Sequence, residues 1–313
     1  MNSDRMLFPP GRLGEPRRYS DPRREVEQPG SDVKFPPVEN GIDYLLSVID
    51  LLAKEDDTKI SARELKYSVL HLQAAAEVLL KARLLQVDWK LVPSRLNRQV
   101  TREQLDAGTV PTCGAVEAAD RLGSPHIGID IGQEAKDALT DLKDVRNRLQ
   151  HYGLTDTAPA IEAKAARVLH FLIRFLHEQL LPAVTTDERE RIHDDMERIR
   201  AGLTHIQALV MKRMEWVRKE LADRRDRTLN CPHCRQLALL VEGGWTTCYF
   251  CSLKSQSGQA AHDYVFYVLG RWWGMDEEDP VKRCPECGFE DLVSNVTTAA
   301  APETPIPFCF HCG

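Results

Sequence analysis

The spacing of apolar residues along the chain predicts a mostly α-helical protein. Between residues 39 and 182, apolar side chains recur every three or four positions in several windows, as they do where one face of a helix is buried. The clearest window is rich in Ala, Leu, Glu and Lys, which favour helices. Its regularly spaced positions are Leu65, Val69, Leu72, Ala76, Leu79 and Arg83.

A second regular helix is expected to begin near Gln133 and to end before Gly153, because a glycine often lies just past a helix end. Residues 92–131, between these two helices, are rich in Pro and Gly and predict loops with short helices. A last helix ends at Pro182. We therefore expect a helical-bundle domain over residues 39–185.

Residues 186–227 predict one long helix, with Thr186 and Asp187 near its N-cap. At a rise of 1.5 Å per residue it would span about 60 Å. Heptad spacing of its apolar residues favours a coiled coil, although a hairpin partner or packing on the first domain would bury the same face. The spaced positions are Ile192, Met196, Ile199, Leu203, Ile206 and Val210, followed after a stutter by Met214, Val217 and Leu221.

Residues 1–38 predict a disordered tail. They hold seven prolines and seven Lys or Arg, and they show almost no apolar periodicity. Such a segment cannot bury enough apolar surface to offset the entropy of ordering it.

Composition is that of a soluble protein, with 42% hydrophobic and 28% charged residues and a mean hydropathy of -0.37. No apolar run approaches the roughly 18 residues that a membrane span requires, and no apolar core follows the first basic residues, as it would in a secretory signal. These features predict a cytoplasmic protein that does not enter a membrane.

Eight of the nine cysteines form four Cys-x-x-Cys pairs in the last third of the chain. This spacing lets two thiolates from one tight turn bind the same ion, and two such turns complete a tetrahedral zinc site. In a cytoplasmic chain the pattern favours metal over disulfides. The pairs are Cys231 and Cys234, Cys248 and Cys251, Cys284 and Cys287, and Cys309 and Cys312.

We expect residues 228–313 to form tandem zinc ribbons with an intervening helix, and the protein to hold two zinc ions. Consecutive pairs would give two sequential ribbons, which we favour, whereas alternate pairs would interleave them. All eight thiolates would be used, so the sites would be structural and closed. The remaining Cys113 is expected to be an ordinary buried thiol. The nearby histidines His233, His262 and His311 are expected on the surface.

One short stretch, Arg146 to His151, carries groups that suffice for RNA cleavage. A step of about 100° per residue puts Asn147 and His151 on one helix face and Arg146 beside them. Arginine can clamp a phosphate with two hydrogen bonds, and histidine can move protons near neutral pH.

This stretch matches the R-x4-6-H signature of the HEPN superfamily, including the polar Asn147 directly after the arginine, and the Ala-rich segment 71–83 is similar to a helix of those domains. Members are all-α and usually dimerise so that two motifs form one composite site, and many are ribonucleases that act as toxins or in antiviral defence against phage. The resemblance implies that Arg146 and His151 are catalytic and that Asn147 orients them. In the subset silenced by tyrosine modification the motif is H-x-Y. Tyr152 here follows His151 directly, so this control is not expected.

The favoured interpretation is thus a metal-independent endoribonuclease that acts on RNA as a homodimer, with the ribbons as a sensing or recruitment module. The alternative is a non-catalytic HEPN-like adaptor. Residues 228–313 carry five basic and ten acidic side chains, a net charge of -5. Because phosphate binding depends on Lys and Arg, this acidic region is better suited to a protein partner than to nucleic acid.

Overall fold

The computed structural model describes residues 34–54, 59–96, 99–271 and 279–313. The predicted disordered tail therefore lies mainly outside the described residues. The mostly helical fold is confirmed. Within the described ranges, no helix combines the length and apolarity that a membrane span needs.

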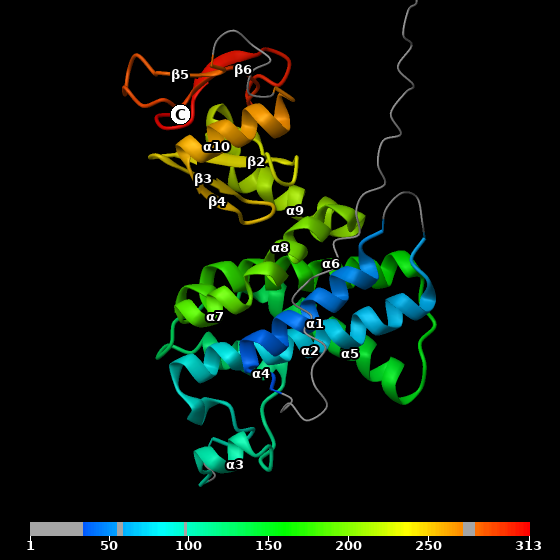
Figure 1. The fold of residues 1–313 in the computed structure, drawn as a ribbon. Coiled ribbons are helices and arrows are strands. Elements are labelled where there is room, and N and C mark those ends of the chain that lie inside the picture. Colours follow the sequence, from blue (N-terminus) through cyan, green and yellow to red (C-terminus); the bar gives the residue numbers. More distant parts are fainter. Residues whose placement is uncertain (1–33, 55–58, 97–98, 272–278) are drawn as a thin grey trace, which may run out of the picture. The chain divides into compact units, whose positions relative to one another are not determined.

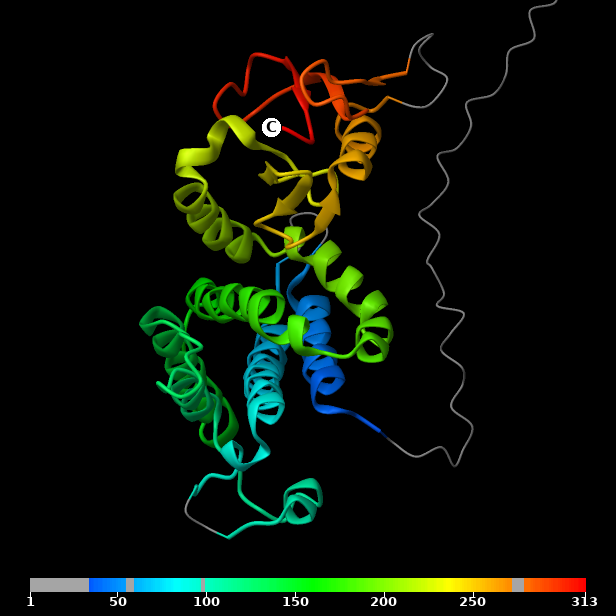
Figure 2. The ribbon, with the colours of Figure 1, turned by 90° about the vertical axis from the view of Figure 1, so that its left-hand side faces the viewer.

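The helical domain is built around α2, Ala62–Val87, which packs against four other helices. Figures 1 and 2 show α1 lying beside it. The side chain of Ser61 and that of Glu64 cap its first turn reciprocally. Its predicted apolar positions, Leu65 to Leu79, are buried. The other elements of this domain are α1 Pro37–Leu52, η1 Trp89–Leu91, α3 Arg102–Asp106, α4 Ala115–Leu122, α5 Gln133–His151, α6 Ala158–Phe175, η2 Leu176–Leu180 and η3 Leu181–Ala183.

The prediction of one long coiled-coil helix over 186–227 is wrong. The segment is broken at Ile192 and again at Ile206, whose backbone is extended. It forms α7 Thr186–Arg191, α8 His193–Gly202, η4 Leu203–His205, α9 Gln207–Glu220 and η5 Ala222–Arg227.

The apolar stripe of this segment is buried within the chain itself. Helix α8 packs on α1, and α9 packs on α6. Five stripe positions, Ile192, Met196, Ile199, Leu203 and Ile206, are at most 4% exposed. A heptad stripe can be buried against a helical bundle of the same chain as well as against a partner chain, so the spacing alone could not distinguish the two. The stripe therefore gives no support to dimerisation.

The C-terminal region contains two small antiparallel sheets. The first has the order β1-β2-β3-β4, and the second β5-β6-β7. Gly243 and Gly244, both with positive φ, turn the chain between β2 and β3, as expected of a hairpin. The strands are β1 Thr228–Asn230, β2 Leu237–Glu242, β3 Trp245–Cys248, β4 Lys254–Gln256, β5 Val281–Lys282, β6 Leu292–Val296 and β7 Ile306–Cys309.

The expected helix between the sheets is present as α10, Ser257–Asp263, continued by η6, Tyr264–Val268. The Tyr264 ring lies 5.3 Å from that of Phe310, which follows β7. The backbone N–H of Gly244 also donates to the carbonyl of His311. The two ribbons are therefore packed on each other rather than independent.

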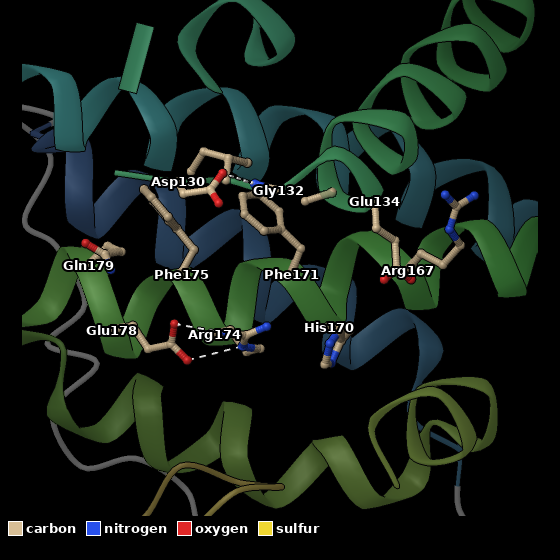
Figure 3. A pocket seen from close by; sticks show the side chains of 12 residues that line it. Asp130, Gly132, Glu134, Arg167, His170, Phe171, Arg174, Phe175, Glu178 and Gln179 are labelled. Carbon is tan, nitrogen blue, oxygen red and sulfur yellow. Dashed lines mark hydrogen bonds and ion pairs between the residues drawn. The ribbon is translucent and has the colours of Figure 1, made fainter. Parts of the chain in front are cut away.

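A cavity of about 300 Å³ lies between the start of α5 and α6. Figure 3 shows Phe171 and Phe175 pointing from α6 toward the segment that carries Asp130 and Gly132. Four of the charged groups that line it belong to ion pairs: Glu134 with Lys212, Arg167 with Asp141, and Arg174 with Glu178. Asp130 instead accepts a hydrogen bond from the backbone N–H of Gly132. Because these groups already have partners, this cavity is not a strong candidate for a ligand site.

Gly202 sets how closely α8 approaches α1. A Cβ atom at this position would lie 2.2 Å from Cγ2 of Ile49. Alanine is intrinsically better than glycine in a helix by about 1 kcal/mol, yet we expect Gly202→Ala to destabilise the protein by about 1–3 kcal/mol through overpacking. Thermal or urea unfolding measures this. Gly123→Ala is the control, since the nearest atom there is at 3.5 Å, and an equal effect of both substitutions would contradict the explanation.

Two histidines of the helical domain, the buried His170 and the half-buried His177, make it sensitive to acid. Burial, with Arg213 nearby, lowers the pKa of His170 from 6.5 to about 3, and burial, with Arg200 nearby, lowers that of His177 to about 3. The unfolded chain therefore binds protons below about pH 6.5 that the folded protein does not bind, so stability falls as pH decreases through this range.

We expect His170→Gln to flatten the decline in unfolding free energy between pH 7 and pH 5. The neutral side chain removes a contribution that approaches about 1.4 kcal/mol per pH unit well below pH 6.5. Urea unfolding at several pH values measures this, with His193→Gln, an exposed position, as the control. Parallel profiles for wild type and His170→Gln would refute the assignment.

Candidate metal centres and catalytic motif

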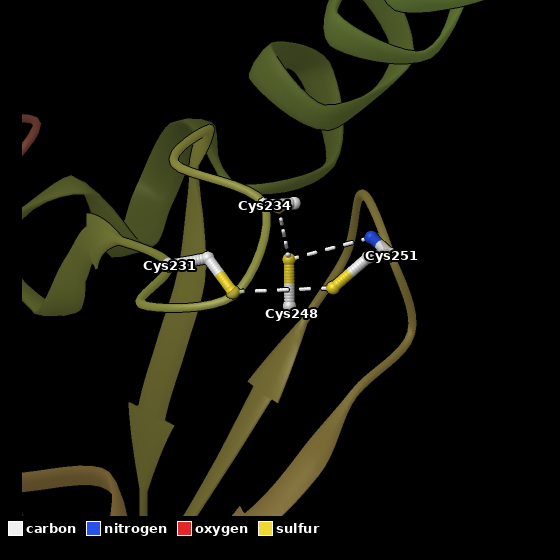
Figure 4. A group of neighbouring side chains, drawn as sticks. All are labelled: Cys231, Cys234, Cys248 and Cys251. Atoms are coloured by element: carbon white, nitrogen blue, oxygen red, sulfur yellow. Dashed lines mark hydrogen bonds between the residues drawn. The ribbon is translucent and has the colours of Figure 1, made fainter. Parts of the chain in front are cut away.

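The first ribbon brings four cysteines together in one buried cluster. The Sγ atoms of Cys231, Cys234, Cys248 and Cys251 all lie within 4.8 Å of one another (Figure 4). Two of the separations are 3.9 Å and 3.6 Å. A tetrahedral ion with metal–sulfur bonds of about 2.3 Å separates its sulfurs by about 3.8 Å. The cluster thus has the dimensions of a four-thiolate metal site.

The second ribbon repeats this arrangement with Cys284, Cys287, Cys309 and Cys312. The Sγ atoms of Cys284 and Cys312 are 3.9 Å apart, and those of Cys287 and Cys309 are 3.6 Å apart. Cys312 is exposed, so this cluster is more open to solvent than the first. Consecutive pairs meet in both ribbons, as favoured from the sequence, and the interleaved alternative is wrong.

All four Cys-x-x-Cys pairs adopt the same backbone turn. The residue after the second cysteine has a positive φ in each case: Arg235, Ser252, Gly288 and Gly313. Its N–H donates to the carbonyl of the first cysteine at 2.8 to 2.9 Å. Glycine adopts this conformation freely, whereas Arg235 and Ser252 adopt it at some cost, so the turn is imposed by the surroundings of the cluster.

Backbone amides in these turns favour the thiolate form of cysteine. Those of Cys287 and Glu286 lower the pKa of Cys284 to about 7. A thiolate is the form that binds a metal ion. Burial has the opposite effect on Cys113, which is fully buried and whose pKa is raised. As expected, Cys113 is a buried thiol of the core.

The histidines near the clusters do not join them. Among the described residues, the two groups with metal-binding geometry consist of cysteine alone. His311 instead stacks on Phe289, with ring centroids 3.8 Å apart. His233 is exposed and His262 is half-buried.

Arg213 on α9 connects the first cluster to the helical domain. Its side chain is 0% exposed. One terminal nitrogen donates to the carbonyl of Tyr249, between Cys248 and Cys251, at 2.8 Å, and the other to the carbonyl of His170 on α6 at 3.4 Å.

The charge of Arg213 is retained in this buried position. Burial lowers its pKa to about 10, while the sulfurs of Cys248 and Cys251 raise it. The guanidinium also lies 5.6 Å from the ring centroid of Phe250. Four thiolates around a divalent ion carry a net charge of -2, so a buried cation beside them compensates part of it.

Arg213 was not among the residues predicted from the sequence, although the sequence contained a signal for it. It occupies the position, between Ile206 and Val217, at which regular heptad spacing calls for an apolar side chain. A lone arginine in an otherwise apolar stripe indicates a buried, partnered charge.

The candidate catalytic residues lie at the end of α5. The side chains of Arg146 and Asn147 are half-buried and hydrogen-bonded to each other at 3.0 Å. They line a groove of about 400 Å³. His151 is exposed in the last turn of the same helix, and the adjacent Tyr152 is 95% exposed. The structure therefore joins Arg146 to Asn147, and His151 stands one helical turn from Asn147 without lining the groove.

Comparison of the chain with known protein families, curated proteins and solved structures finds no match.

Loss of the Arg213 side chain is expected to destabilise the junction of α6, α9 and the first ribbon. Arg213→Ala leaves the carbonyls of Tyr249 and His170 without their donor and should cost about 3–5 kcal/mol. Denaturant unfolding, followed by the fluorescence of Trp216, which stacks on Tyr249 at 5.7 Å, measures this. Arg218→Ala, at an exposed position of the same helix, should change stability by less than about 0.5 kcal/mol. A loss no larger for Arg213 than for Arg218 would show that the buried cation is not structural.

Proposed function

We propose that this protein is an endoribonuclease of the HEPN type, active as a homodimer, with two structural zinc ions in its C-terminal ribbons. The observation that supports the proposal is the half-buried, hydrogen-bonded pair Arg146 and Asn147 near the end of α5, with His151 exposed one helical turn after Asn147. The sequence resemblance supplies the reaction class, and the groove beside Arg146 has room for about one nucleotide.

The proposed reaction uses the ribose 2'-OH as nucleophile. Its oxygen forms a bond to the adjacent phosphorus while the bond from phosphorus to the 5'-oxygen breaks. The histidine takes up the 2' proton and gives a proton to the leaving 5'-oxygen, and the arginine stabilises charge on the phosphoryl oxygens. The products are a 2',3'-cyclic phosphate and a 5'-OH. DNA has no 2'-OH and is not a substrate in this scheme.

Dimerisation is proposed to complete the catalytic site, because Arg146, Asn147 and His151 do not all meet in one chain. Arg146 already bonds Asn147, while His151 is exposed and outside the groove. In the proposed homodimer a second copy of this surface brings its own motif to the site. The strongly exposed Tyr152 beside His151 is available for that contact.

Zinc is the proposed ion in both cysteine clusters. Four thiolates in tetrahedral arrangement are its usual structural ligands, and a complete set leaves no open position for water or substrate. The ions would stabilise the ribbons, and the chemistry at Arg146 and His151 would not involve them.

A protein-binding role of the ribbons is the second candidate function. Large hydrophobic side chains remain exposed there, including Trp245 at 45%, Tyr267 at 50% and Phe289 at 52%. With the net charge of -5 in residues 228–313, this surface suits a protein partner better than a phosphate backbone. If the protein is a ribonuclease, this surface of the ribbons serves for sensing or recruitment. If the protein is not catalytic, the same surface makes it an adaptor.

Cleavage of RNA tests the catalytic proposal. We expect wild-type protein to leave 2',3'-cyclic phosphate ends, without short-term inhibition by EDTA. Arg146→Ala and His151→Ala should each lower the rate about 10²- to 10⁴-fold, with helicity, zinc content and oligomeric state unchanged. Arg148→Ala, an exposed arginine on the same helix, should retain activity. Undetectable cleavage by wild type, or undiminished cleavage by both variants, would favour the adaptor.

Metal content tests the zinc proposal. Protein purified without chelators should contain two zinc ions per chain by elemental analysis, and Cys→Ser at any paired cysteine should lower this number, whereas Cys113→Ser should not. Because Arg213 connects the first cluster to α6, Cys248→Ser is expected to destabilise the helical domain more than Cys284→Ser does. Metal near zero in the wild type would disprove the assignment.

A further inference from the structure

The groove beside Arg146 has the composition of a ligand site. It lies where α2, α4 and α5 meet and has a volume of about 400 Å³, within the range of small-molecule sites. Its lining includes Gln73 from α2, the first residues of α4, and Lys143, Arg146 and Asn147 from α5.

Gln73 is the least expected of these residues. It is 7% exposed, and its Oε1 is buried without a hydrogen-bond partner. Such an atom costs about 1–3 kcal/mol and is uncommon in a native structure. The terminal amide turns easily about χ3, so a ligand in the groove can satisfy it.

The start of α4 supplies hydrogen-bond donors to the same groove. Its N-cap is Gly114, which has no side chain to accept from the first turn. The N–H groups at a helix start attract anions. Lys143, which is exposed, and Arg146, which is half-buried, add two cations on the facing helix α5.

The acidic residues that line the groove are neutralised by neighbours. Glu77 pairs with Lys81, Glu117 with Arg121, and Asp120 with Lys136. The lining itself holds three acidic side chains and two basic ones, Lys143 and Arg146. Since each acid is paired with a cation outside the lining, Lys143 and Arg146 are the groups that attract an anion into the groove.

We propose that this groove binds one nucleotide of the RNA chain, with its phosphate at the start of α4 beside Lys143 and Arg146 and its base against Gln73. The inference rests on the proposed ribonuclease function and adds to it how the strand is held. The partnerless Oε1 accepts a hydrogen bond, so it favours a base that presents an N–H donor to it. Adenine fits best, because a glutamine amide matches its N6 and N7 edge. Uracil has no exocyclic amino group and offers only its ring N3–H.

Direct binding of mononucleotides tests this without RNA cleavage. Titration of the His151→Ala protein with AMP, UMP or inorganic phosphate, followed by calorimetry or NMR, should give an affinity order of AMP over UMP over phosphate. Gln73→Leu should weaken AMP about tenfold, to the level of UMP, since one hydrogen bond to the base is lost. Lys143→Ala, at an exposed position that cannot unfold the core, should weaken all three ligands.

Gln86→Leu is the matched control. Gln86 lies on the same helix and also has a buried Oε1 without a partner, but it does not line this groove. Absence of AMP binding at millimolar concentration would overturn the inference, as would equal affinity for AMP and phosphate, or equal effects of Gln73→Leu and Gln86→Leu. AMP binding in a protein that never cleaves RNA would support the nucleotide site and refute the ribonuclease.

Discussion

The buried charge of Arg213 is the constraint on which the junction of this protein depends. A permanent cation with no exposed surface must be compensated, since desolvation of an unpaired charge costs several kcal/mol. Compensation comes from the carbonyls of Tyr249 and His170, the ring of Phe250 and the nearby cysteine sulfurs. These partners belong to the helical domain and to the first ribbon. Neither part alone supplies all of these partners. The burial of Arg213 therefore favours the packing of α9 on α6.

The ribbons need their cysteine clusters for a different reason. Sheets of four and three short strands bury too little apolar surface to offset their ordering entropy, and small modules of this kind usually require a metal or another crosslink. The repeated turn after each Cys-x-x-Cys pair, including the strained Arg235 and Ser252, is stabilised by the cluster that it encloses. An ion bound in the first cluster would also stabilise the helical domain, because Arg213 contacts both parts.

The proposed nucleotide site of the helical domain is formed by α5 together with α2 and α4. Arg146 and Asn147 are adjacent in sequence and hydrogen-bonded, but the groove that they line is completed by Gln73 of α2 and the uncapped start of α4. A phosphate clamp without a neighbouring base site would act on any phosphate. The proposed combination binds a nucleotide, which is the unit that an endoribonuclease must position.

The sequence alone determined the features that local spacing encodes. The four Cys-x-x-Cys pairs predicted the ligands of both clusters, and the 3.6-residue period predicted α2 and α5, because each pair and each helical face depends on residues within a few positions of one another. The tertiary structure decided where apolar stripes are buried. The heptad pattern of 192–221 fits a partner helix and a bundle surface equally, and only the packing of α8 on α1 and α9 on α6 resolves it. Arg213 and Gln73 acquire their roles from residues 36 and more than 40 positions away. The apolar stripe around Arg213 indicates that the charge is buried, but only the folded structure shows which distant residues are the neighbours of Arg213 and Gln73.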